Sequence, residues 1–135
     1  MPYEMKIRFP GGLKVDVLDR DFVVRTDQPV REGGEGSAPS PFDLFLASLA
    51  ACAGYYALAF CKEREIPVDD IGVSMTATRG EESKMIDDVR ITLDLPASFP
   101  ERYRPALVKA VDLCAVKKHI LRPPRFEIVT RTKGL

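Results

Sequence analysis

One stretch decides the fold of this chain: residues 40–64, SPFDLFLASLAACAGYYALAFCKER. Ser40 is a typical helix N-cap, and Pro41 suits the first helical position, so a helix begins here. The apolar pattern continues to Lys62 and Arg64, basic residues suited to the last turn of a helix. It stops ahead of Pro67, which cannot continue a helix. We therefore predict a helix over residues 41–65.

This predicted helix is apolar on every side. From Leu44 to Cys61 it runs for 18 residues without a charged side chain, which is the lower edge of membrane-spanning length. The run is rich in Ala, Ser and Gly, and it stands alone in a small chain that needs a core, so we expect a buried helix rather than a membrane span. A chain of 135 residues cannot easily cover every face of such a helix. We therefore predict an obligate homodimer that encloses it.

Composition fits a single folded domain over residues 1–135, with 45% apolar and 30% charged residues. Twenty basic residues balance twenty acidic ones, so the net charge is zero and gives no drive toward nucleic acid. The beginning of the sequence lacks the features of a signal peptide, and three cysteines are too few for a secreted disulfide scaffold. We therefore expect a cytoplasmic protein with reduced thiols and no membrane partner.

Short segments with alternating hydrophobicity flank the helix and predict strands. We expect an antiparallel meander within residues 1–26, a loop over 27–40, a β-hairpin within 70–95, two helices within 101–121 and a last strand over 125–131. The predicted order is β-β-β-α-β-β-α-α-β. Because the strands come in antiparallel groups and do not alternate with helices, the predicted class is α+β. The residues expected to point inward from the helix after position 100 are Leu107, Val108, Val111 and Leu113.

The cysteines are the candidate reactive residues of this sequence. His119 is the only histidine, and no Cys-x-x-Cys pair exists, so no metal site is predicted. No glycine pattern typical of a phosphate-binding loop occurs, and we expect no cofactor. Cys52 lies in the middle of the long helix, and Cys61 lies nine residues on, about half a turn round its axis, so the two cannot share one pocket. Each cysteine could also simply pack in a core.

Cys52 needs outside help to become a thiolate, because it lies too far along its helix to benefit from the N-terminal N–H groups. A cation from elsewhere could supply that help. The candidates are Arg20, Arg25 and Arg31, from the third strand region and the loop before the helix. The alternative for each is a solvated surface charge, which is the more common role of an arginine. Tyr55, three residues after Cys52, lies on nearly the same helix face and could line an apolar pocket beside the sulfur.

The segment GSAPSPFDLFLASLAACAG, residues 36–54, resembles the OsmC/Ohr family of osmotically inducible and organic-hydroperoxide-resistance proteins. That family combines a loop of small residues, a Ser/Asn-Pro start, an acidic first turn and an Ala-rich helix that ends in a cysteine. Residues 113–118, LCAVKK, resemble its second cysteine motif. The resemblance extends over nearly the whole chain and matches the predicted order of elements.

The resemblance implies an intertwined homodimer with shared sheets and with active sites at the dimer interface. It implies a peroxidase in which Cys52 attacks an organic hydroperoxide and becomes a sulfenic acid. Cys114 would then resolve that acid as a disulfide, and a dithiol reductant, lipoyl-bearing in the best-known members, would restore both thiols. Arg25, with Arg20 and Arg31 as alternates, would lower the pKa of Cys52. The apolar substrate pocket would be lined by Phe42, Phe45 and Tyr55.

The sequence also departs from the family pattern. The peroxidase branch has a glutamate directly after the Ser/Asn-Pro start, where this chain has Phe42. Asp43 is half a turn away from Cys52, so Glu32 or Glu35 of the loop are alternative acidic partners. The proline that follows the second cysteine in many members is also missing. Three alternatives to a peroxidase therefore stay open: a binding protein for a small apolar or thiol-reactive ligand, another thiol reaction, and purely structural cysteines.

Overall fold

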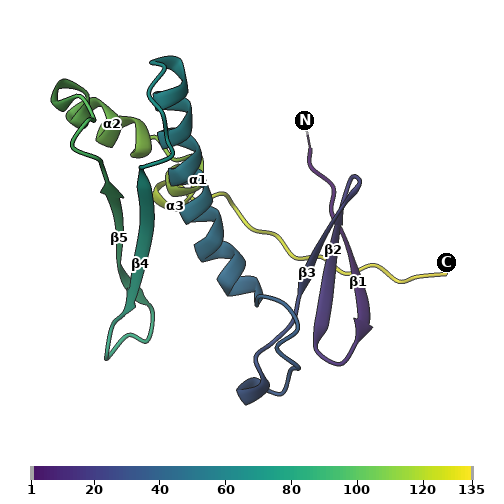
Figure 1. The fold of residues 1–135 in the computed structure, drawn as a ribbon. Helices are drawn as coiled ribbons and strands as arrows, with labels where there is room; N and C mark the ends of the chain where they lie inside the picture. The colour runs from purple at the N-terminus through teal and green to yellow at the C-terminus, as the bar shows by residue number, and fades with distance from the viewer. Residues whose placement is uncertain (1, 135) are drawn as a thin grey trace. The chain divides into compact units, whose positions relative to one another are not determined.

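The computed structural model describes residues 2–134, which form two compact units that divide between Ser48 and Leu49 (Figure 1). The elements in chain order are β1 (Lys6–Gly11), β2 (Lys14–Asp19), β3 (Phe22–Thr26), η1 (Val30–Glu32), α1 (Pro41–Glu63), β4 (Gly72–Arg79), β5 (Ile86–Asp94), η2 (Glu101–Tyr103), α2 (Arg104–Val111) and α3 (Ala115–Leu121). The predicted α+β class is confirmed. We call the part up to Ser48 the N-terminal unit and the part from Leu49 the C-terminal unit.

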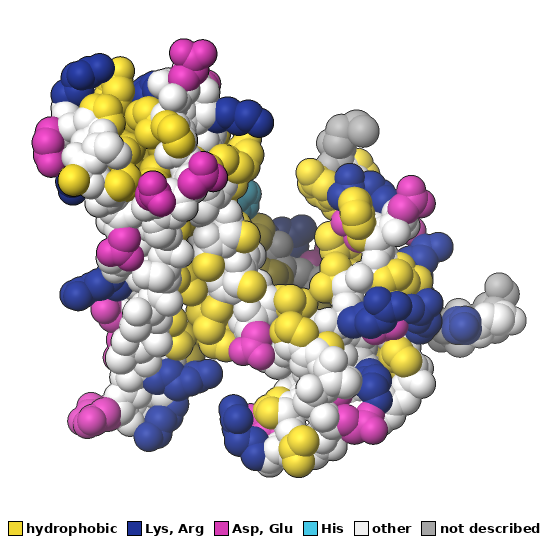
Figure 2. Space-filling view, viewed as in Figure 1, with side chains coloured by type: hydrophobic (Ala, Val, Ile, Leu, Met, Phe, Trp, Pro, Cys, Tyr) yellow, Lys and Arg dark blue, Asp and Glu magenta, His cyan; other side chains and the backbone are white. Residues whose placement is uncertain are grey.

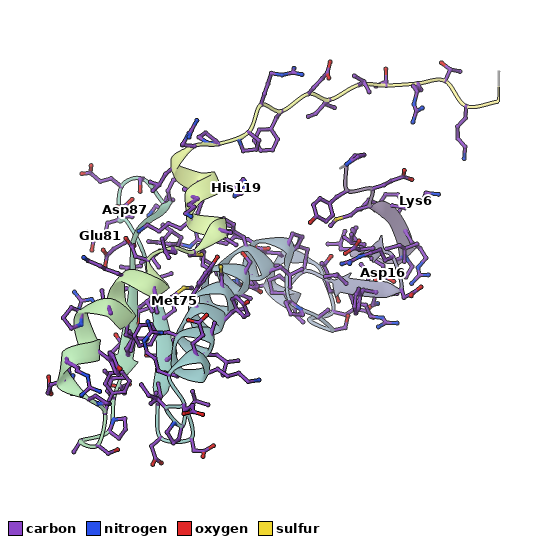
Figure 3. All side chains as sticks on the ribbon, turned by 90° about the horizontal axis from the view of Figure 1, so that it is seen from above. Lys6, Asp16, Met75, Glu81, Asp87 and His119 are labelled. Atoms are coloured by element: carbon purple, nitrogen blue, oxygen red, sulfur yellow. The ribbon has the colours of Figure 1, made fainter. Side chains whose placement is uncertain are left out.

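The N-terminal unit contains the predicted meander, a sheet of order β1-β2-β3 with both pairs antiparallel. Ile7 lies opposite Val17, and Val17 lies opposite Val24, so these three side chains form an apolar row on one face. The other face is polar at Asp16, labelled in Figure 3, whose carboxylate accepts a hydrogen bond of 2.8 Å from Arg8 Nη2.

The loop after β3 is ordered around a buried carboxylate. Asp27 is fully buried, and its Oδ2 accepts hydrogen bonds from the N–H and the hydroxyl of Ser37 at 3.0 and 2.6 Å. Its Oδ1 accepts from Gln28 N at 2.7 Å, and its own N–H donates to the carbonyl of Pro39. Gly34 is required here, because a Cβ at that position would lie 2.0 Å from the carbonyl oxygen of Gln28.

The ends of α1 follow from local hydrogen bonding. At the start, Ser40 Oγ accepts from Asp43 N at 3.1 Å while Asp43 Oδ2 accepts from Ser40 N at 3.0 Å, which is a reciprocal capping box. At the end, Ile66 N donates to the carbonyl of Cys61, and Glu65 takes a left-handed φ of 54°. This is a Schellman motif, and it ends the helix shortly before the predicted residue 65.

The apolar core lies in the C-terminal unit, where α1 packs with the α2 region beside the antiparallel β4–β5 hairpin. Its buried members are Ala53, Ala57, Phe60, Cys61, Phe99, Leu107 and Val111. The Arg64 guanidinium covers the Phe60 ring at 3.7 Å and donates to the Phe60 carbonyl, which closes the end of the core next to the last turn of α1.

Three expectations need correction. The predicted last strand over 125–131 is not a strand, because its residues have no neighbouring strand among those described and its side chains are exposed. In the helix after position 100, Leu107 and Val111 point inward as predicted, but Val108 and Leu113 are 59% and 51% exposed. Leu107 and Val111 are one helical turn apart and share the core-facing side of α2, whereas Val108 lies off that side and Leu113 lies in the turn after the helix.

The long helix is not enclosed on all sides within one chain. Within residues 2–134, α1 alone is long and apolar enough to cross a membrane by length and composition. Its side toward the core is buried, including Ala53 and Ala57, whereas Tyr55 is 62% exposed and Leu58 45% exposed. Figure 2 shows apolar side chains at the surface among the charged ones.

Candidate functional site

Cys52 and Cys114 meet in the C-terminal unit. Cys52 is half-buried on α1, and Cys114 is buried at the N-cap position of α3. Both are free thiols, and each one shifts the pKa of the other. Although the two residues are 62 positions apart in the sequence, the fold brings their side chains close enough to interact.

Cys52 lies in surroundings that favour its thiolate. Burial by itself raises the pKa of this thiol, but hydrogen bonds from the Cys114 side chain and from the backbone N–H groups of Val116 and Ala115 outweigh that effect. The net result is a Cys52 pKa below its ordinary value. The stabilising groups come from the beginning of α3, a source that the residue pattern did not indicate.

Cys114 has the opposite character. Burial raises its pKa, and the hydrogen bond and the charge of the neighbouring Cys52 raise it further. The Cys114 Sγ also accepts a hydrogen bond of 3.4 Å from Lys117 N, which caps α3. Of the two thiols, Cys52 is therefore the more readily ionised and Cys114 the less readily ionised.

Cys61 takes no part in this pair. It is fully buried in the apolar core, and burial raises the pKa of its thiol. Since a neutral buried thiol packs as a small apolar side chain, Cys61 has the structural surroundings of a core residue.

The three candidate arginines lie in the N-terminal unit, whereas both paired cysteines lie in the C-terminal unit. Arg20 forms an ion pair with Asp19 at 3.3 Å, and its guanidinium lies 5.4 Å from the centre of the Phe22 ring. Arg25 is exposed on β3 opposite Asp16, and Arg31 is exposed on η1. Arg25 and Arg31 make no ion pair with any residue that the structure describes.

The acidic candidates have local structural partners in two of three cases. Asp43 belongs to the capping box of α1, and Glu35 forms an ion pair with Lys14 of β2. Glu32 is exposed on η1. The buried carboxylate of this unit is instead Asp27, whose pKa is held below its usual range by hydrogen bonds from Ser37 and Gln28. The sequence signal for Asp27 was its position at the junction of a strand and a loop, where Asp side chains often accept hydrogen bonds from backbone N–H groups.

The aromatic candidates are largely exposed in the single chain. Phe42 and Phe45, at the start of α1, are 42% and 40% exposed, with ring centres 5.7 Å apart. Tyr55 stacks edge-on against Tyr56 at 5.4 Å. None of these three predicted pocket residues lines the cavity found in the C-terminal unit.

That cavity has a volume of about 720 Å³ and opens beside Cys114. Its walls are mostly apolar side chains of β5, α2 and α3, with Leu49 from α1. The charged residues in its lining are Arg90, Arg104, Lys109, Asp112 and Lys117. Ligand cavities commonly have volumes between about 300 and 1,000 Å³, so this one can hold a small apolar molecule.

Metal ligands do not gather in this fold. Within residues 2–134, no group of three or more His, Cys, Asp or Glu side chains is placed to hold a metal ion. His119, labelled on α3 in Figure 3, places its Nδ1 2.6 Å from the carbonyl oxygen of Ala115, in its own helix.

The fold and the paired thiols define a class: small α+β proteins with one cysteine on a long apolar helix and a second at the start of a short one. Residues 34–129 match the family described as OsmC-like protein, and this range contains both cysteine motifs. The chain therefore belongs to the OsmC family. Proteins of this family are generally soluble and in general dimeric. No curated protein matches the sequence.

Solved structures agree with this fold. A protein assigned to the osmotic stress and detoxification response of Psychrobacter arcticus aligns with a TM-score of 0.70 at 22% identity, over 84% of this chain and 85% of its own. An OsmC-like protein from Mycoplasma pneumoniae aligns with a TM-score of 0.65 at 14% identity, over 90% of this chain and 88% of its own. The organic hydroperoxide resistance protein OsmC from Legionella pneumophila aligns with a TM-score of 0.55 at 20% identity, over 89% of each chain.

Proposed function

We propose that this protein is a thiol peroxidase that reduces organic hydroperoxides in oxidative stress defence. The observation that carries the proposal is the proximity of Cys52 and Cys114, in which the first thiol has a lowered pKa and the second a raised one. Peroxide reduction by cysteine needs such an unequal pair, because a thiolate must attack and a second thiol must react at the same place afterwards.

In the first step, the Cys52 thiolate attacks one oxygen of the hydroperoxide and the O–O bond breaks. The other fragment leaves as an alkoxide and takes up a proton, which gives an alcohol and a Cys52 sulfenic acid. The peroxide is reduced by two electrons, and the Cys52 sulfur is oxidised by two. Cys114, which interacts with Cys52 in the fold, is the thiol that would resolve the sulfenic acid.

In the second step, the Cys114 sulfur attacks the sulfenic sulfur of Cys52. Its proton leaves with the sulfenic hydroxyl as water, and the Cys52–Cys114 disulfide forms. An external dithiol, of the lipoyl type, then reduces this disulfide by two thiol–disulfide exchanges and becomes a disulfide itself. The cycle needs no metal and no organic cofactor.

The apolar cavity beside Cys114 supports an apolar substrate rather than a small polar one. Phe42, Phe45 and Tyr55 would extend the apolar surface around the reacting sulfur in the assembled protein. Arg25, which has no ion-pair partner among the described residues, is the arginine we favour for further activation of Cys52, with Arg20 and Arg31 as alternates. Glu32 is the acidic side chain still available to orient such an arginine.

The functional form that we propose is a cytoplasmic homodimer. Large apolar side chains stay exposed in the single chain, including Phe126 and Ile128, which are 83% and 96% exposed. These two side chains lie in the extended segment that was predicted to be a strand, and a second copy would supply the neighbouring strand that the segment lacks. Light scattering after gel filtration should give a mass of about twice 15.0 kDa.

The direct test adds one equivalent of cumene hydroperoxide to the reduced protein and maps thiols by mass spectrometry. We expect a loss of two hydrogens and a Cys52–Cys114 cross-link, formed within seconds. Cys52→Ser should abolish turnover, and Cys114→Ser should stop after one oxidation with a trapped Cys52 sulfenic acid. Cys61→Ala is the matched control and should keep full turnover. Multiple turnover by Cys52→Ser would contradict the mechanism.

Two observations favour a second candidate, a binding protein without peroxidase turnover. Phe42 occupies the position of the glutamate that the resemblance leads one to expect, and a cavity of about 720 Å³ is present. In that case all three thiols should survive cumene hydroperoxide. Purified protein should then release a small apolar molecule on denaturation, detectable by mass spectrometry.

A further inference from the structure

We propose that the cavity beside Cys114 is the binding site of the reducing dithiol, and that this dithiol attacks the Cys114 sulfur of the oxidised pair and not the Cys52 sulfur. The inference rests on the proposed function in one respect only, that Cys52 and Cys114 form a disulfide. It deepens that function by assigning a site to the second substrate and by naming the sulfur at which reduction begins.

The cavity reaches one member of the cysteine pair. Among the described residues, Cys114 belongs to its wall and Cys52 does not. Cys114 is only 3% exposed, so a reagent needs the cavity in order to contact it. A thiolate attacks a disulfide in line with the S–S bond, from the side of the attacked sulfur that faces away from the leaving sulfur. A molecule bound in this cavity touches Cys114 alone of the pair, which fits attack at Cys114 with Cys52 as the leaving group.

The size and the walls of the cavity suit an alkyl chain that carries two thiols. Its volume is about 720 Å³, and its walls include Ile91 and Leu93 of β5, Val108 of α2 and Ile120 of α3. Apolar walls with a few polar groups are the usual surroundings of a bound small molecule. These side chains can pack against the chain of the dithiol while its sulfur points toward Cys114.

The charges in the cavity wall favour the reactive form of the reductant. Two of the four cations there, Arg104 and Lys117, have carboxylate partners. The other two, Arg90 and Lys109, make no ion pair with any residue in the range 2–134. Asp112 is the one acidic residue in the described wall, so positive charge is in excess. Since the thiolate and not the thiol is the nucleophile, this excess favours attack by an incoming dithiol.

Reduction then takes two exchanges. In the first, a thiolate of the dithiol forms an S–S bond with Cys114, the Cys52–Cys114 bond breaks, and Cys52 leaves as a thiolate. In the second, the other sulfur of the dithiol loses its proton and attacks its partner sulfur in the mixed disulfide. The dithiol closes to a disulfide, and Cys114 leaves and takes up a proton. Two electrons pass from the dithiol to the protein.

The order of attack agrees with the unequal acidity of the two thiols. The pKa of Cys52 is lowered and the pKa of Cys114 is raised, and a thiol of lower pKa leaves faster from a disulfide. Attack at Cys52 would expel the poorer leaving group. The peroxide has already departed as an alcohol when the dithiol arrives, so one apolar cavity can serve both substrates in turn.

A trapping experiment identifies the attacked sulfur. The Cys52–Cys114 disulfide is prepared with diamide, which takes two electrons and two protons from the pair. The probe is 6-mercaptohexanoic acid, an alkyl monothiol that cannot close to a ring disulfide. After a brief reaction, acid quench and peptic digestion at low pH, mass spectrometry should find the probe on Cys114, in roughly tenfold excess over Cys52. Equal labelling, labelling mainly at Cys52, or failure of diamide to form the disulfide would overturn the proposal.

A cavity variant separates the site from the leaving-group effect. Val108→Trp places a larger side chain in the wall at a residue that is 59% exposed, and it should slow labelling of Cys114 by roughly tenfold, because attack needs aligned sulfurs. Met85→Trp is the matched control: Met85 is 69% exposed and outside the cavity wall, and its labelling rate should be unchanged. Equal rates for the two variants would overturn the assignment of the cavity.

Neither measurement uses a hydroperoxide, so the two proposals can fail separately. Labelling at Cys114 without peroxide turnover would refute the peroxidase alone. Peroxide turnover with labelling at Cys52 would refute this inference alone. The trapping experiment uses the unsubstituted protein and decides the attacked sulfur even if Val108→Trp fails to fold.

Discussion

The two units of this chain bury opposite kinds of residue. Among the described residues of the N-terminal unit, the buried ones are all polar: Asp16, Thr26 and Asp27. In the C-terminal unit, they are all apolar, from Leu49 and Ala53 through Leu107 to Cys114. Hydrophobic burial is the dominant favourable term in folding, so only the C-terminal unit has a core of its own. The N-terminal sheet keeps an apolar row exposed, and this difference indicates which part of the chain needs a partner surface.

Leu107→Ala should have the largest effect on stability, because it removes a fully buried side chain from the core of the C-terminal unit. We expect the free energy of unfolding to fall by about 2–5 kcal/mol, measured by urea denaturation. Val108→Ala, one residue along and 59% exposed, is the matched control and should cost far less. Equal losses for both variants would mean that the core is not where we place it.

Ile7→Asp tests whether the exposed apolar row of the N-terminal sheet is covered by a second chain. Ile7 is 51% exposed, so in a monomer the charge should be tolerated with little change in stability. In a dimer that buries this face, an unpaired carboxylate should weaken association by roughly tenfold or more. Sedimentation velocity over a dilution series measures the shift. Lys6→Asp, on the opposite face, is the control; identical behaviour of the two variants would argue against this surface.

Asp27→Asn tests how much the buried carboxylate stabilises the N-terminal unit, through the pH dependence of the free energy of unfolding. The pKa of Asp27 is lowered in the fold, so its carboxylate adds stability above its unfolded value of about 3.8, and this stability is lost as the pH falls through the lower folded value. The variant should therefore be less stable than the original protein at pH 7, with a difference that shrinks toward pH 3. A difference that stays constant over this range would show that Asp27 stabilises the loop by shape alone.

Glu65→Gly should give the smallest change, and in the stabilising direction. Glu65 has a φ of 54° in the Schellman motif that ends α1, and a left-handed conformation costs a non-glycine residue about 1 kcal/mol. Thermal unfolding should show a slightly higher midpoint. Glu63→Gly, two residues earlier within the helix, should lower it. A lower unfolding midpoint in both variants would mean that the left-handed turn does not limit the stability of this helix end.

Periodicity and turn residues were sufficient for most of the architecture. The meander, the long helix and the hairpin follow from alternation, from the Ser40-Pro41 start and from the breaks at Gly and Pro, and all of them are confirmed. The segment 125–131 shows the limit of this reasoning, because alternation predicts a strand only where another strand is available to bond with it. Val108 shows another limit, since an apolar side chain can belong to a helix and still lie outside the core. Leu113 lies in the turn after that helix.

The sequence by itself determined the class, the long apolar helix and the two cysteines whose motifs resemble those of the OsmC family, because these depend on local patterns. Only the tertiary structure decided how Cys52 is activated. The pKa of its thiol is lowered by Cys114 and by the N–H groups of Ala115 and Val116, which lie more than 60 residues further along the chain. Backbone N–H groups leave no mark in a sequence, since every residue except proline carries one. Their role is created by where the chain folds back, and that depends on packing.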